Sequence, residues 1–271
     1  MDKINVIKVG GAVVENEASL KELINQFATM PGYKVLVHGG GRSATRIAAQ
    51  LGIESHMVGG RRITDEDMLQ VVTMVYGGLV NKRIVAALQA KGVNAVGLTG
   101  ADMDIIRSHK REPKMVTMDD GSQQLVDFGY VGDVDSANGR RLAALIKPQE
   151  GVEAVVPVVA PLTHDGKGNI LNTNADTMAA TVAKALTEEF EVTLTYCFEK
   201  PGVMADADDD DSVIPTINTE SYAQLKADGI VSGGMIPKLD NAFDSISSGV
   251  KRVVITHFMD IQASQGTVIE K

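Results

Sequence analysis

The 271-residue sequence has no tryptophan, a single cysteine and few aromatic residues, and each scarcity excludes something. With no tryptophan and only 4% aromatic residues, side chains on which nucleic-acid bases could stack are scarce. One cysteine, Cys197, excludes an internal disulfide and fits a reducing compartment. Because Cys197 lies in an apolar stretch, we interpret it as a buried packing residue and not as a reactive thiol.

The sequence also has fewer basic than acidic residues and few long apolar runs. The chain has 26 Lys and Arg against 35 Asp and Glu, and its pI is near 5.1, which argues against binding to nucleic acid or to an anionic membrane. The N-terminus has no arginine-rich or apolar leader, and we read no apolar run as approaching membrane-spanning length. We therefore expect a soluble, cytoplasmic protein with no nucleic-acid and no membrane partner.

Two common nucleotide-binding signatures are missing. No Gly-Lys-Ser/Thr occurs, so there is no Walker A loop. The run Gly39-Gly40-Gly41 is followed by Arg42-Ser43-Ala44, so the third glycine of a dinucleotide-binding turn is absent. An enzyme with this sequence that binds phosphate would therefore need a different phosphate-binding loop.

Strand-like apolar runs alternate with helix-like stretches along most of the chain, and 44% of the residues are hydrophobic. We expect strands near residues 4–9, 33–38, 93–98, 154–158, 192–198 and 251–256, and helices near 15–29, 42–51, 65–90, 136–147, 175–187, 219–227 and 235–248. The strands are continuous Val/Ile/Leu runs, as expected where both sheet faces are covered. The pattern predicts an α/β fold, a three-layer αβα sandwich with a mostly parallel central sheet.

Residues 101–133 break this alternation. Short β-like pieces joined by polar turns predict β-hairpins inserted at one edge of the sheet, where they could form a lid over a site. A boundary near residue 173 would divide a single domain into two unequal parts that share one sheet. Thr64 and Asn174 are the expected N-caps of the helices that follow them.

Two strands in the first forty residues run directly into glycines. The run at residues 4–9 ends in Gly10-Gly11, and the run at 34–38 ends in Gly39-Gly40-Gly41. Consecutive glycines at a strand end can turn several N–H groups toward an anion, and a following helix adds its positive end. Lys8 stands two residues before the first pair. From these residues alone, phosphate binding and simple tight turns both remain open.

Five motifs in order make the pattern specific. They are Lys8-Val9-Gly10-Gly11, Val37-His38-Gly39-Gly40-Gly41, Gly60-Arg61-Arg62-Ile63-Thr64, Asn172-Thr173-Asn174-Ala175-Asp176 and Gly233-Gly234-Met235-Ile236-Pro237-Lys238. Over residues 3 to about 257 the chain resembles the amino acid kinase family, and within it the N-acetylglutamate kinases. Each motif alone is weak, but the five together carry the resemblance.

The resemblance implies transfer of the γ-phosphoryl group of ATP, carried with Mg²⁺, to the side-chain carboxylate of an N-acylated glutamate. The nucleophile is already an anion at neutral pH, so no general base is required. The reaction requires in-line positioning and compensation of charge between two anions. It also implies that residues 1–173 bind the acyl amino acid and residues 174–271 bind the nucleotide.

The resemblance assigns the charged residues to the phosphoryl group and the donor. Lys8 would lie beside the phosphoryl group in transfer, and Lys238 would lie on the nucleotide side. Asp176 would hold both ammonium groups in place and would not take a proton. Gly10 and Gly11 would face the β- and γ-phosphates.

The acceptor side is assigned in the same way. Gly40 and Gly41 would donate backbone N–H groups to the acceptor and to the phosphoryl oxygens. Arg62 would pair with the α-carboxylate, because a planar fork suits a carboxylate, whereas Arg61 is expected in solvent or at an interface. Asn172 would bond the acylamino group or the α-carboxylate.

Several other residues are expected to be structural. His38 has no proton to move in this reaction and is expected to pack at the strand end. Residues 109–111 with Lys114 read as a solvated hairpin turn, and the acidic residues 206–211 as a solvated loop without the spacing of a metal site. Asn174 is better explained as a helix cap. We therefore expect no metal site built from protein side chains.

The chain departs from the family pattern in two places. Phe198-Glu199 stands where the family has a Ser/Thr-Asp pair that shapes the nucleotide pocket. The loop at residues 97–102 near the acyl group also diverges, which leaves N-acetyl and N-succinyl substrates open. A succinyl group would need a further cation, for which Arg107 or Lys110 are the candidates.

Members inhibited by arginine carry an additional N-terminal helix, whereas this chain begins almost directly with its first strand. The resemblance therefore implies an arginine-insensitive homodimer. The expected interface is the long apolar helix that contains Val71, Val72, Met74 and Val75.

Two other readings compete with this one. Another member of the family, such as a carbamate kinase or a nucleoside monophosphate kinase, would share the glycines and lysines, but Arg62 and Asn172 argue against it. A catalytically silent nucleotide or amino-acid sensor would not need to keep Lys8, Asp176 and Lys238 together.

Overall fold

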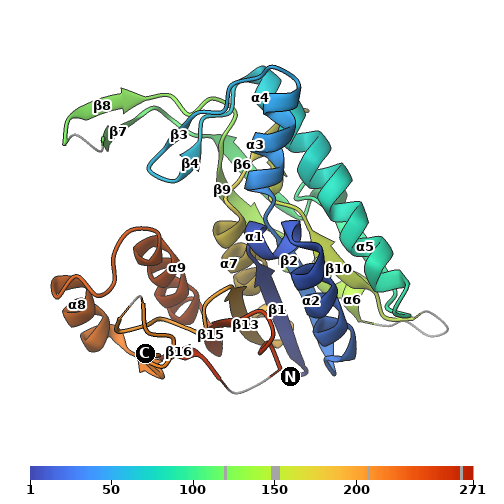
Figure 1. Cartoon of the computed structure of the whole chain (residues 1–271). Coiled ribbons are helices and arrows are strands. Elements are labelled where there is room, and N and C mark those ends of the chain that lie inside the picture. Colours follow the sequence, from blue (N-terminus) through green and yellow to red (C-terminus); the bar gives the residue numbers. More distant parts are fainter. Residues whose placement is uncertain (119–120, 148–152, 207, 263–264, 271) are drawn as a thin grey trace.

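The computed structural model describes residues 1–118, 121–147, 153–206, 208–262 and 265–270 (Figure 1). Within them, an eight-stranded sheet has the order β14-β16-β15-β13-β1-β2-β10-β5. Its strands are β1 (Lys3–Val9), β2 (Tyr33–His38), β5 (Ala95–Leu98), β10 (Val156–Val159), β13 (Glu191–Phe198), β14 (Thr216–Ile217), β15 (Arg252–His257) and β16 (Thr267–Ile269). The pairing of β15 with β16 is antiparallel and the other pairings are parallel, so the predicted α/β class is confirmed.

Helices cover both faces of this sheet. One face carries α6 (Gly139–Ile146), α7 (Ala175–Leu186) and α9 (Met235–Ser247), with α8 (Thr219–Ala227) beside α9. The other carries α1 (Gly11–Glu15), α2 (Glu17–Thr29), α3 (Gly41–Gln50), α4 (Glu66–Val72) and α5 (Asn81–Gln89). Two separate apolar clusters fill the two interfaces, so the three-layer arrangement is confirmed as well.

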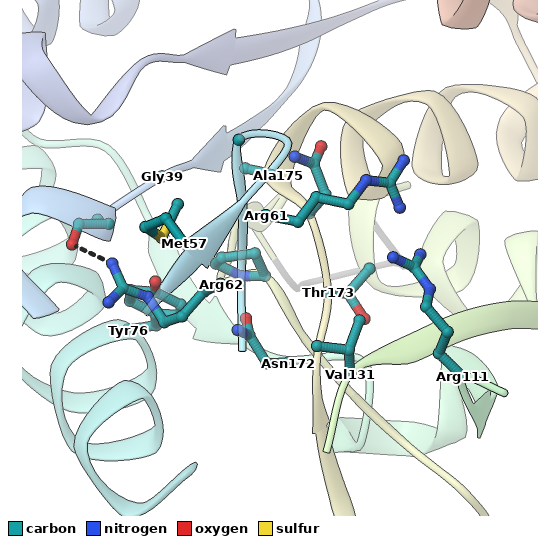
Figure 2. Close-up of a pocket in the computed structure, with 15 residues that line it drawn as sticks. Gly39, Met57, Arg61, Arg62, Tyr76, Arg111, Val131, Asn172, Thr173 and Ala175 are labelled. Carbon is teal, nitrogen blue, oxygen red and sulfur yellow. Dashed lines mark hydrogen bonds between the residues drawn. The ribbon is translucent and has the colours of Figure 1, made fainter. Parts of the chain in front are cut away.

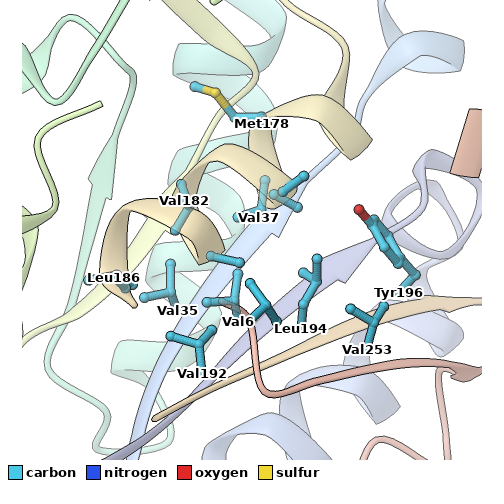
Figure 3. Close-up of a cluster of buried hydrophobic side chains, with 14 of the residues drawn as sticks. Val6, Val35, Val37, Met178, Val182, Leu186, Val192, Leu194, Tyr196 and Val253 are labelled. Atoms are coloured by element: carbon cyan, nitrogen blue, oxygen red, sulfur yellow. The ribbon is translucent and has the colours of Figure 1, made fainter. Parts of the chain in front are cut away.

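Successive side chains of β1 point to opposite faces of the sheet, so this strand contributes to both apolar clusters. Val6 packs in the cluster under α7, which Figure 3 shows with Val35 and Val37 of β2, whereas Ile7 and Val9 pack in the cluster on the opposite face. Each fully buried side chain of this kind stabilises the fold by roughly 1.5–3 kcal/mol. The same period of two turns Lys8 to the α7 face.

A long helix runs without a break through α4, the π-helix η1 (Thr73–Val80) and α5. Its N-cap is Asp65, whose carboxylate accepts the N–H of Met68 at 2.8 Å, so the predicted cap at Thr64 is wrong by one residue. Thr64 is fully buried and forms β-like hydrogen bonds with the chain at 128–130. That pairing takes Thr64 away from the helix.

By length and composition this helix, Glu66–Gln89, could cross a bilayer, although no such run was expected from the sequence. Its inner face is nevertheless packed against the sheet, and the buried residues there include Val71, Val72, Val75, Ile84 and Leu88. It is therefore a core helix.

The segment at 101–137 contributes to a second sheet, so the expectation of hairpins added to the edge of the first sheet is wrong. The second sheet has the order β12-β11-β6-β9, made of β6 (Ile106–Lys110), β9 (Gly132–Ala137), β11 (Leu162–His164) and β12 (Ile170–Asn172). The chains leaving β5 and β10 cross into it at Gly100, whose N–H donates to Leu162 O at 2.7 Å. A Cβ at Gly100 would lie 2.9 Å from that same oxygen, so only glycine fits the crossing.

Two hairpins project from this part of the molecule (Figure 1). One pairs β7 (Lys114–Thr117) with β8 (Gln123–Val126), which confirms the predicted hairpin although β8 ends before residue 130. The other pairs β3 (Met57–Val58) with β4 (Arg61–Arg62).

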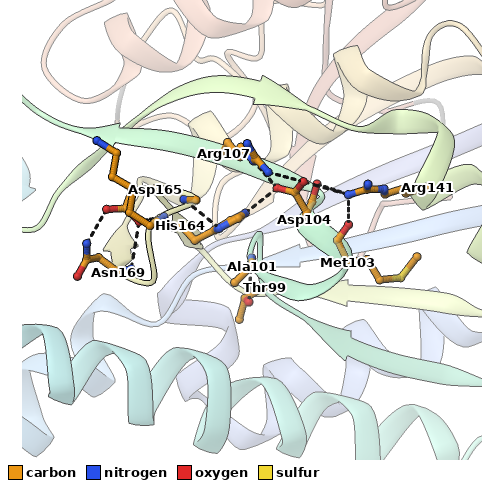
Figure 4. A network of polar contacts seen from close by, with 11 residues as sticks. Thr99, Ala101, Met103, Asp104, Arg107, Arg141, His164, Asp165 and Asn169 are labelled. Atoms are coloured by element: carbon orange, nitrogen blue, oxygen red, sulfur yellow. Dashed lines mark hydrogen bonds and ion pairs between the residues drawn. The ribbon is translucent and has the colours of Figure 1, made fainter.

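A polar network ties the second sheet to α6 (Figure 4). Asp104 accepts from Arg107 Nε at 2.6 Å, from Arg141 Nη1 at 3.1 Å and pairs with His164 Nε2 at 2.9 Å. The hydrogen bond from Arg107 is the first of several influences that hold the pKa of Asp104 at about 2. Arg107 is therefore engaged with Asp104.

Candidate functional site

The two glycine loops lie against each other. Strands β1 and β2 are parallel neighbours with Val9 opposite His38, so their carboxyl ends meet at one sheet edge. A Cβ added at Gly11 would lie 3.6 Å from Gly40 N and 3.7 Å from Gly41 N. The structure therefore brings Gly10-Gly11 and Gly40-Gly41 together, and the tightest approach is at Gly39, where an added Cβ would lie 3.2 Å from Gly11 N.

Each loop leads into a helix. Gly10 is the N-cap of the short α1, and Gly40 is the N-cap of α3. The first N–H groups of a helix have no partner within the helix and carry its positive end. One of them is already used, since Ser43 N donates to the carboxylate of Glu15.

Lys8, Asp176 and Lys238 come together from three elements. Lys8 Nζ, on β1, forms an ion pair with Asp176 Oδ1 at 2.7 Å. Lys238 Nζ, on α9, donates a hydrogen bond to Asp176 Oδ2 at 3.2 Å. Asp176 stands in the first turn of α7, where the Asn174 side chain accepts the N–H groups of Asp176 and Thr177, so the predicted cap is confirmed. The cap fixes the carboxylate between the two lysines.

Burial and charge act on this triad in opposite directions. Burial, the largest influence on Asp176, favours its neutral form, but the charges of Lys8 and Lys238 outweigh it and hold the pKa of Asp176 at about 2. Burial, and then the charge of Lys8, lowers the pKa of Lys238, and Asp176 opposes both. The carboxylate is therefore ionised at neutral pH and cannot serve as a base there.

A pocket beside this triad is lined by the glycine loop, β4 and the start of α7 (Figure 2). Its lining includes Gly39, Gly40, Gly41, Met57, Gly60, Arg61, Arg62, Tyr76, Arg111, Val131, Pro161, Asn172, Thr173, Asn174 and Ala175. It contains Gly40, Gly41, Arg62 and Asn172, the four residues assigned to the acceptor from sequence. The pocket and the triad are adjacent, because Asp176 follows Ala175 directly.

Arg62 is buried, and the protein itself fixes most of its guanidinium. Nη2 donates to Gly41 O at 2.8 Å and to Thr45 Oγ1 at 2.9 Å, and Nη1 donates to Ser55 Oγ. Nε is buried without a partner among the described residues. A buried, unpaired N–H on a fixed cation is the arrangement expected where a ligand completes the bonding.

Arg111 is a pocket residue that sequence reasoning missed, because the stretch around it read as a solvated turn. Its side chain is 7% exposed, and its Nε donates to both oxygens of Asp133 at 3.1 Å. The guanidinium lies 5.4 Å from the Phe128 ring centroid. Arg61 is exposed, as expected, and also lines the pocket, so three arginines surround one cavity.

Two further residues complete the wall. Asn172 Nδ2 donates to Thr64 Oγ1 at 2.9 Å, which leaves the amide oxygen as the atom available to a ligand. Tyr76, carried by the π-helix, was missed from sequence. Its ring approaches Gly40 so closely that a Cβ there would lie 3.0 Å from Tyr76 Cδ1.

His38 has the structural role expected for it, and the two candidate cations for a succinyl group lie outside the pocket. His38 is fully buried, its Nδ1 is 2.8 Å from Gly39 O and its Nε2 is 3.2 Å from Asn81 Nδ2, which assigns the proton to Nδ1. Burial lowers the pKa of His38 to about 4, so the ring is neutral. Neither Arg107 nor Lys110 lines the pocket; Lys110 lies over the Tyr130 ring.

The acidic stretch forms turns of its own. Asp206 and Asp209 accept the N–H groups of Asp208 and Asp211 at 3.0 Å, and Lys200 pairs with Asp210. Residue 207 lies outside the described part of the chain. Within that part, no three His, Cys, Asp or Glu side chains are grouped so that they could hold a metal ion.

Comparison with known proteins agrees with this geometry. Residues 3–257 match the amino acid kinase family. An acetylglutamate kinase of Phocaeicola vulgatus is 60% identical over 270 residues, which cover 100% of this chain and 99% of that protein. Among solved structures, a protein of Streptococcus mutans UA159 superposes with a TM-score of 0.75 at 25% identity, covering 98% of both chains. A carbamate kinase of Giardia lamblia bound to AMP-PNP has a TM-score of 0.65 at 16% identity, covering 100% of this chain and 99% of that one, and supports the fold alone.

Proposed function

This chain belongs to the amino acid kinase family and, within it, to the acetylglutamate kinases, and from that premise we propose how its residues carry out the reaction. The reaction is transfer of the γ-phosphoryl group of ATP to the side-chain carboxylate of N-acetylglutamate, a step of arginine biosynthesis. The observation that carries the assignment of residues is the convergence of Lys8 and Lys238 on Asp176 beside an arginine-lined pocket.

Charge compensation is the task of the triad. The acceptor carboxylate and the triphosphate repel each other, and the transferring group spreads negative charge over its oxygens. Lys8, at the end of β1 just before Gly10-Gly11, neutralises that charge, and Lys238 binds the donor phosphates. Asp176 orients both ammonium groups and remains ionised throughout.

The glycine loops supply neutral donors to the same groups. Gly10 and Gly11 offer backbone N–H groups to the β- and γ-phosphates, and Gly40 and Gly41 offer theirs to the acceptor carboxylate. Arg62 pairs with the α-carboxylate through its unpartnered Nε, and the Asn172 oxygen accepts the acylamino N–H. In this arrangement residues 1–173 bind the acceptor and residues 174–271 bind the donor.

The donor is ATP as its magnesium complex, with the ion held by phosphate oxygens and water. Octahedral Mg²⁺ keeps several waters and needs few protein ligands. The lysines and glycines of the site therefore bind the nucleotide complex and not the ion.

A hydroxamate assay tests the function directly. Incubation of the protein with Mg·ATP, hydroxylamine and N-acetylglutamate should give the hydroxamate, because hydroxylamine traps the acyl phosphate product. Free glutamate, which lacks the acyl group, is the matched control. A protein that binds ATP but gives no hydroxamate with any acceptor would be a sensor and not a kinase. Phosphorylation of carbamate or a nucleoside monophosphate instead would make it another member of the family.

The pocket also favours a second acceptor, N-succinylglutamate. One arginine is enough for the α-carboxylate, and Arg111 is already paired with Asp133, so Arg61 is the pocket arginine that a succinyl carboxylate would meet. The assay with both acceptors gives kcat/KM for each. Arg61→Gln should then lower kcat/KM for the succinyl acceptor more than for the acetyl acceptor if Arg61 binds the extra carboxylate.

We also propose a cytoplasmic homodimer. Of the four helix residues expected at an interface, Val71, Val72 and Val75 are buried in the core, so they cannot form it. Met74 is 55% exposed and Leu79 53% exposed on the same helix, and they are the apolar side chains left to pair. Sedimentation of Met74→Asp should shift the protein toward monomer, whereas an unchanged dimer would place the interface elsewhere.

A further inference from the structure

The ammonium group of Lys238 lies over two aromatic rings. Its Nζ is 5.2 Å from the ring centroid of Tyr196 and 5.8 Å from that of Phe198. Both residues come from β13 and are two positions apart, so they share the sheet face that α7 and α9 cover. Cys197, between them, packs on the opposite face.

The two rings lie beside a group of side chains that carries more positive than negative charge. Two lysines share one carboxylate, with Lys8 at Asp176 Oδ1 and Lys238 at Asp176 Oδ2. Their side chains are 11% and 13% exposed, so water screens the surplus positive charge poorly. An aromatic face attracts a cation without neutralising it, whereas a second carboxylate would cancel the charge that a phosphate needs.

We propose that Tyr196 and Phe198 are positioning residues that keep Lys238 protonated and directed toward the donor phosphates while Asp176 is shared with Lys8. The role of Lys238 toward the nucleotide rests on the proposed function. Its protonation does not, because that depends only on the protein. The two parts can therefore be tested separately.

The groups that act on Lys238 come from three other elements. Burial lowers the pKa of Lys238 most and Lys8 on β1 lowers it further, whereas Asp176 on α7 and Cys197 on β13 raise it. Burial raises the pKa of the Cys197 thiol to about 12 and raises the pKa of the Tyr196 phenol further, so both are neutral in the range of interest. The thiol and the phenol therefore do not change charge while Lys238 titrates at lower pH, and a change caused by removal of a ring is read against the same charges of Lys8 and Asp176.

The experiment compares the wild type with Phe198→Leu, which keeps apolar volume but removes the ring. NMR titration of ligand-free protein with ¹³Cε-labelled lysine follows Lys238, and Lys238→Gln assigns its signal. From typical cation–π strengths, we expect the pKa of Lys238 to fall by about 0.5–1 in Phe198→Leu. Phe198→Tyr keeps a ring and should keep the wild-type value.

The same variants are then assayed with ATP. The alkaline limb of kcat/KM for ATP should move to lower pH in Phe198→Leu, because Lys238 loses its proton earlier. At neutral pH, kcat/KM for ATP should fall about three- to tenfold from loss of one cation–π contact.

Phe190→Leu is the matched control. Phe190 lies in the same apolar cluster and also has a lysine over its ring, Lys147 at 4.8 Å, but it precedes the opposite end of β13. It should lower thermal stability without changing the titration of Lys238. An unchanged Lys238 pKa in Phe198→Leu, or an equal fall in Phe190→Leu, would overturn the proposal. A shifted Lys238 pKa in a protein that phosphorylates no acceptor would support it and overturn the proposed function instead.

Discussion

The acceptor pocket and the lysine triad hold their cations in different ways. Arg62 is fixed by Gly41, Thr45 and Ser55 before any substrate binds, so its fork is already oriented. Lys8 and Lys238 stand on flexible stems and share one carboxylate. A rigid fork suits a carboxylate that stays in place, whereas compact ammonium groups can follow charge that moves during transfer.

The largest expected effect is from removal of Lys8, at the end of β1 just before Gly10-Gly11. Lys8→Ala should lower kcat about 10²- to 10⁴-fold with a much smaller change in both KM values, because its charge acts mainly in the transition state. Steady-state kinetics with both substrates checks this. Lys3→Ala, at an 83% exposed side chain on the same strand, should leave kcat unchanged. A loss in Lys8→Ala confined to KM would mean that the lysine only binds ground-state phosphate.

On the acceptor side, the loss should appear in binding. Arg62→Lys keeps the charge but removes the fork, and should raise KM for the acceptor about 10- to 100-fold while kcat falls less. Arg42→Lys, on the exposed side of α3, is the control. Equal falls in kcat for Arg62→Lys and Lys8→Ala would remove the distinction between the two sides.

Part of this site could be predicted from the sequence, and part could not. Lys8 was found because it precedes the glycines at the end of a continuous apolar run, which marks a strand of a buried parallel sheet. Asp176 was found only through the resemblance of residues 172–176 to a family motif. Arg111 was missed because burial of that guanidinium depends on Asp133, 22 positions later across the β6–β9 pairing. A local pattern contains no such information.

The second sheet was misplaced for a related reason. Of its four strands only β6 overlaps a segment predicted as β-like; β9, β11 and β12 are short and were not predicted. The crossing at Gly100 that separates this sheet from the main one is a backbone contact with Leu162. The cap at Asp65 instead of Thr64 has the same origin, because tertiary pairing of Thr64 with the chain near Gly129 decides it.

A milder change tests the wall between the glycine loop and the π-helix. The Cβ of Gly40→Ala would meet the Tyr76 ring at 3.0 Å, so the ring must shift and KM for the acceptor should rise about three- to tenfold. Gly78→Ala, whose Cβ meets nothing within 4 Å, should behave as wild type. Addition of Tyr76→Leu to Gly40→Ala should restore part of the loss, and purely additive effects would show that the two residues do not interact.

A last expected effect is on stability and not on rate. His38 is neutral in the folded protein with a pKa of about 4, below its unfolded value near 6.5. The unfolded state therefore binds the proton first, and the free energy of unfolding should fall by up to about 3 kcal/mol between pH 6.5 and 4. Urea unfolding at several pH values should show a shallower fall in His38→Gln. Parallel curves would assign the acid sensitivity to other groups.

The π-helix at Thr73–Val80 also sets the phase of the long helix. Because a π-turn holds more residues than an α-turn, it rotates α4 relative to α5, and here it lets Tyr76 face the acceptor pocket while Ile84 and Leu88 face the sheet. Loss of one residue within it would keep the rod helical but turn one half by about 100° against the other. The number of residues in this segment, and not only their identity, therefore lets one helix place Tyr76 at the pocket and Ile84 and Leu88 against the sheet.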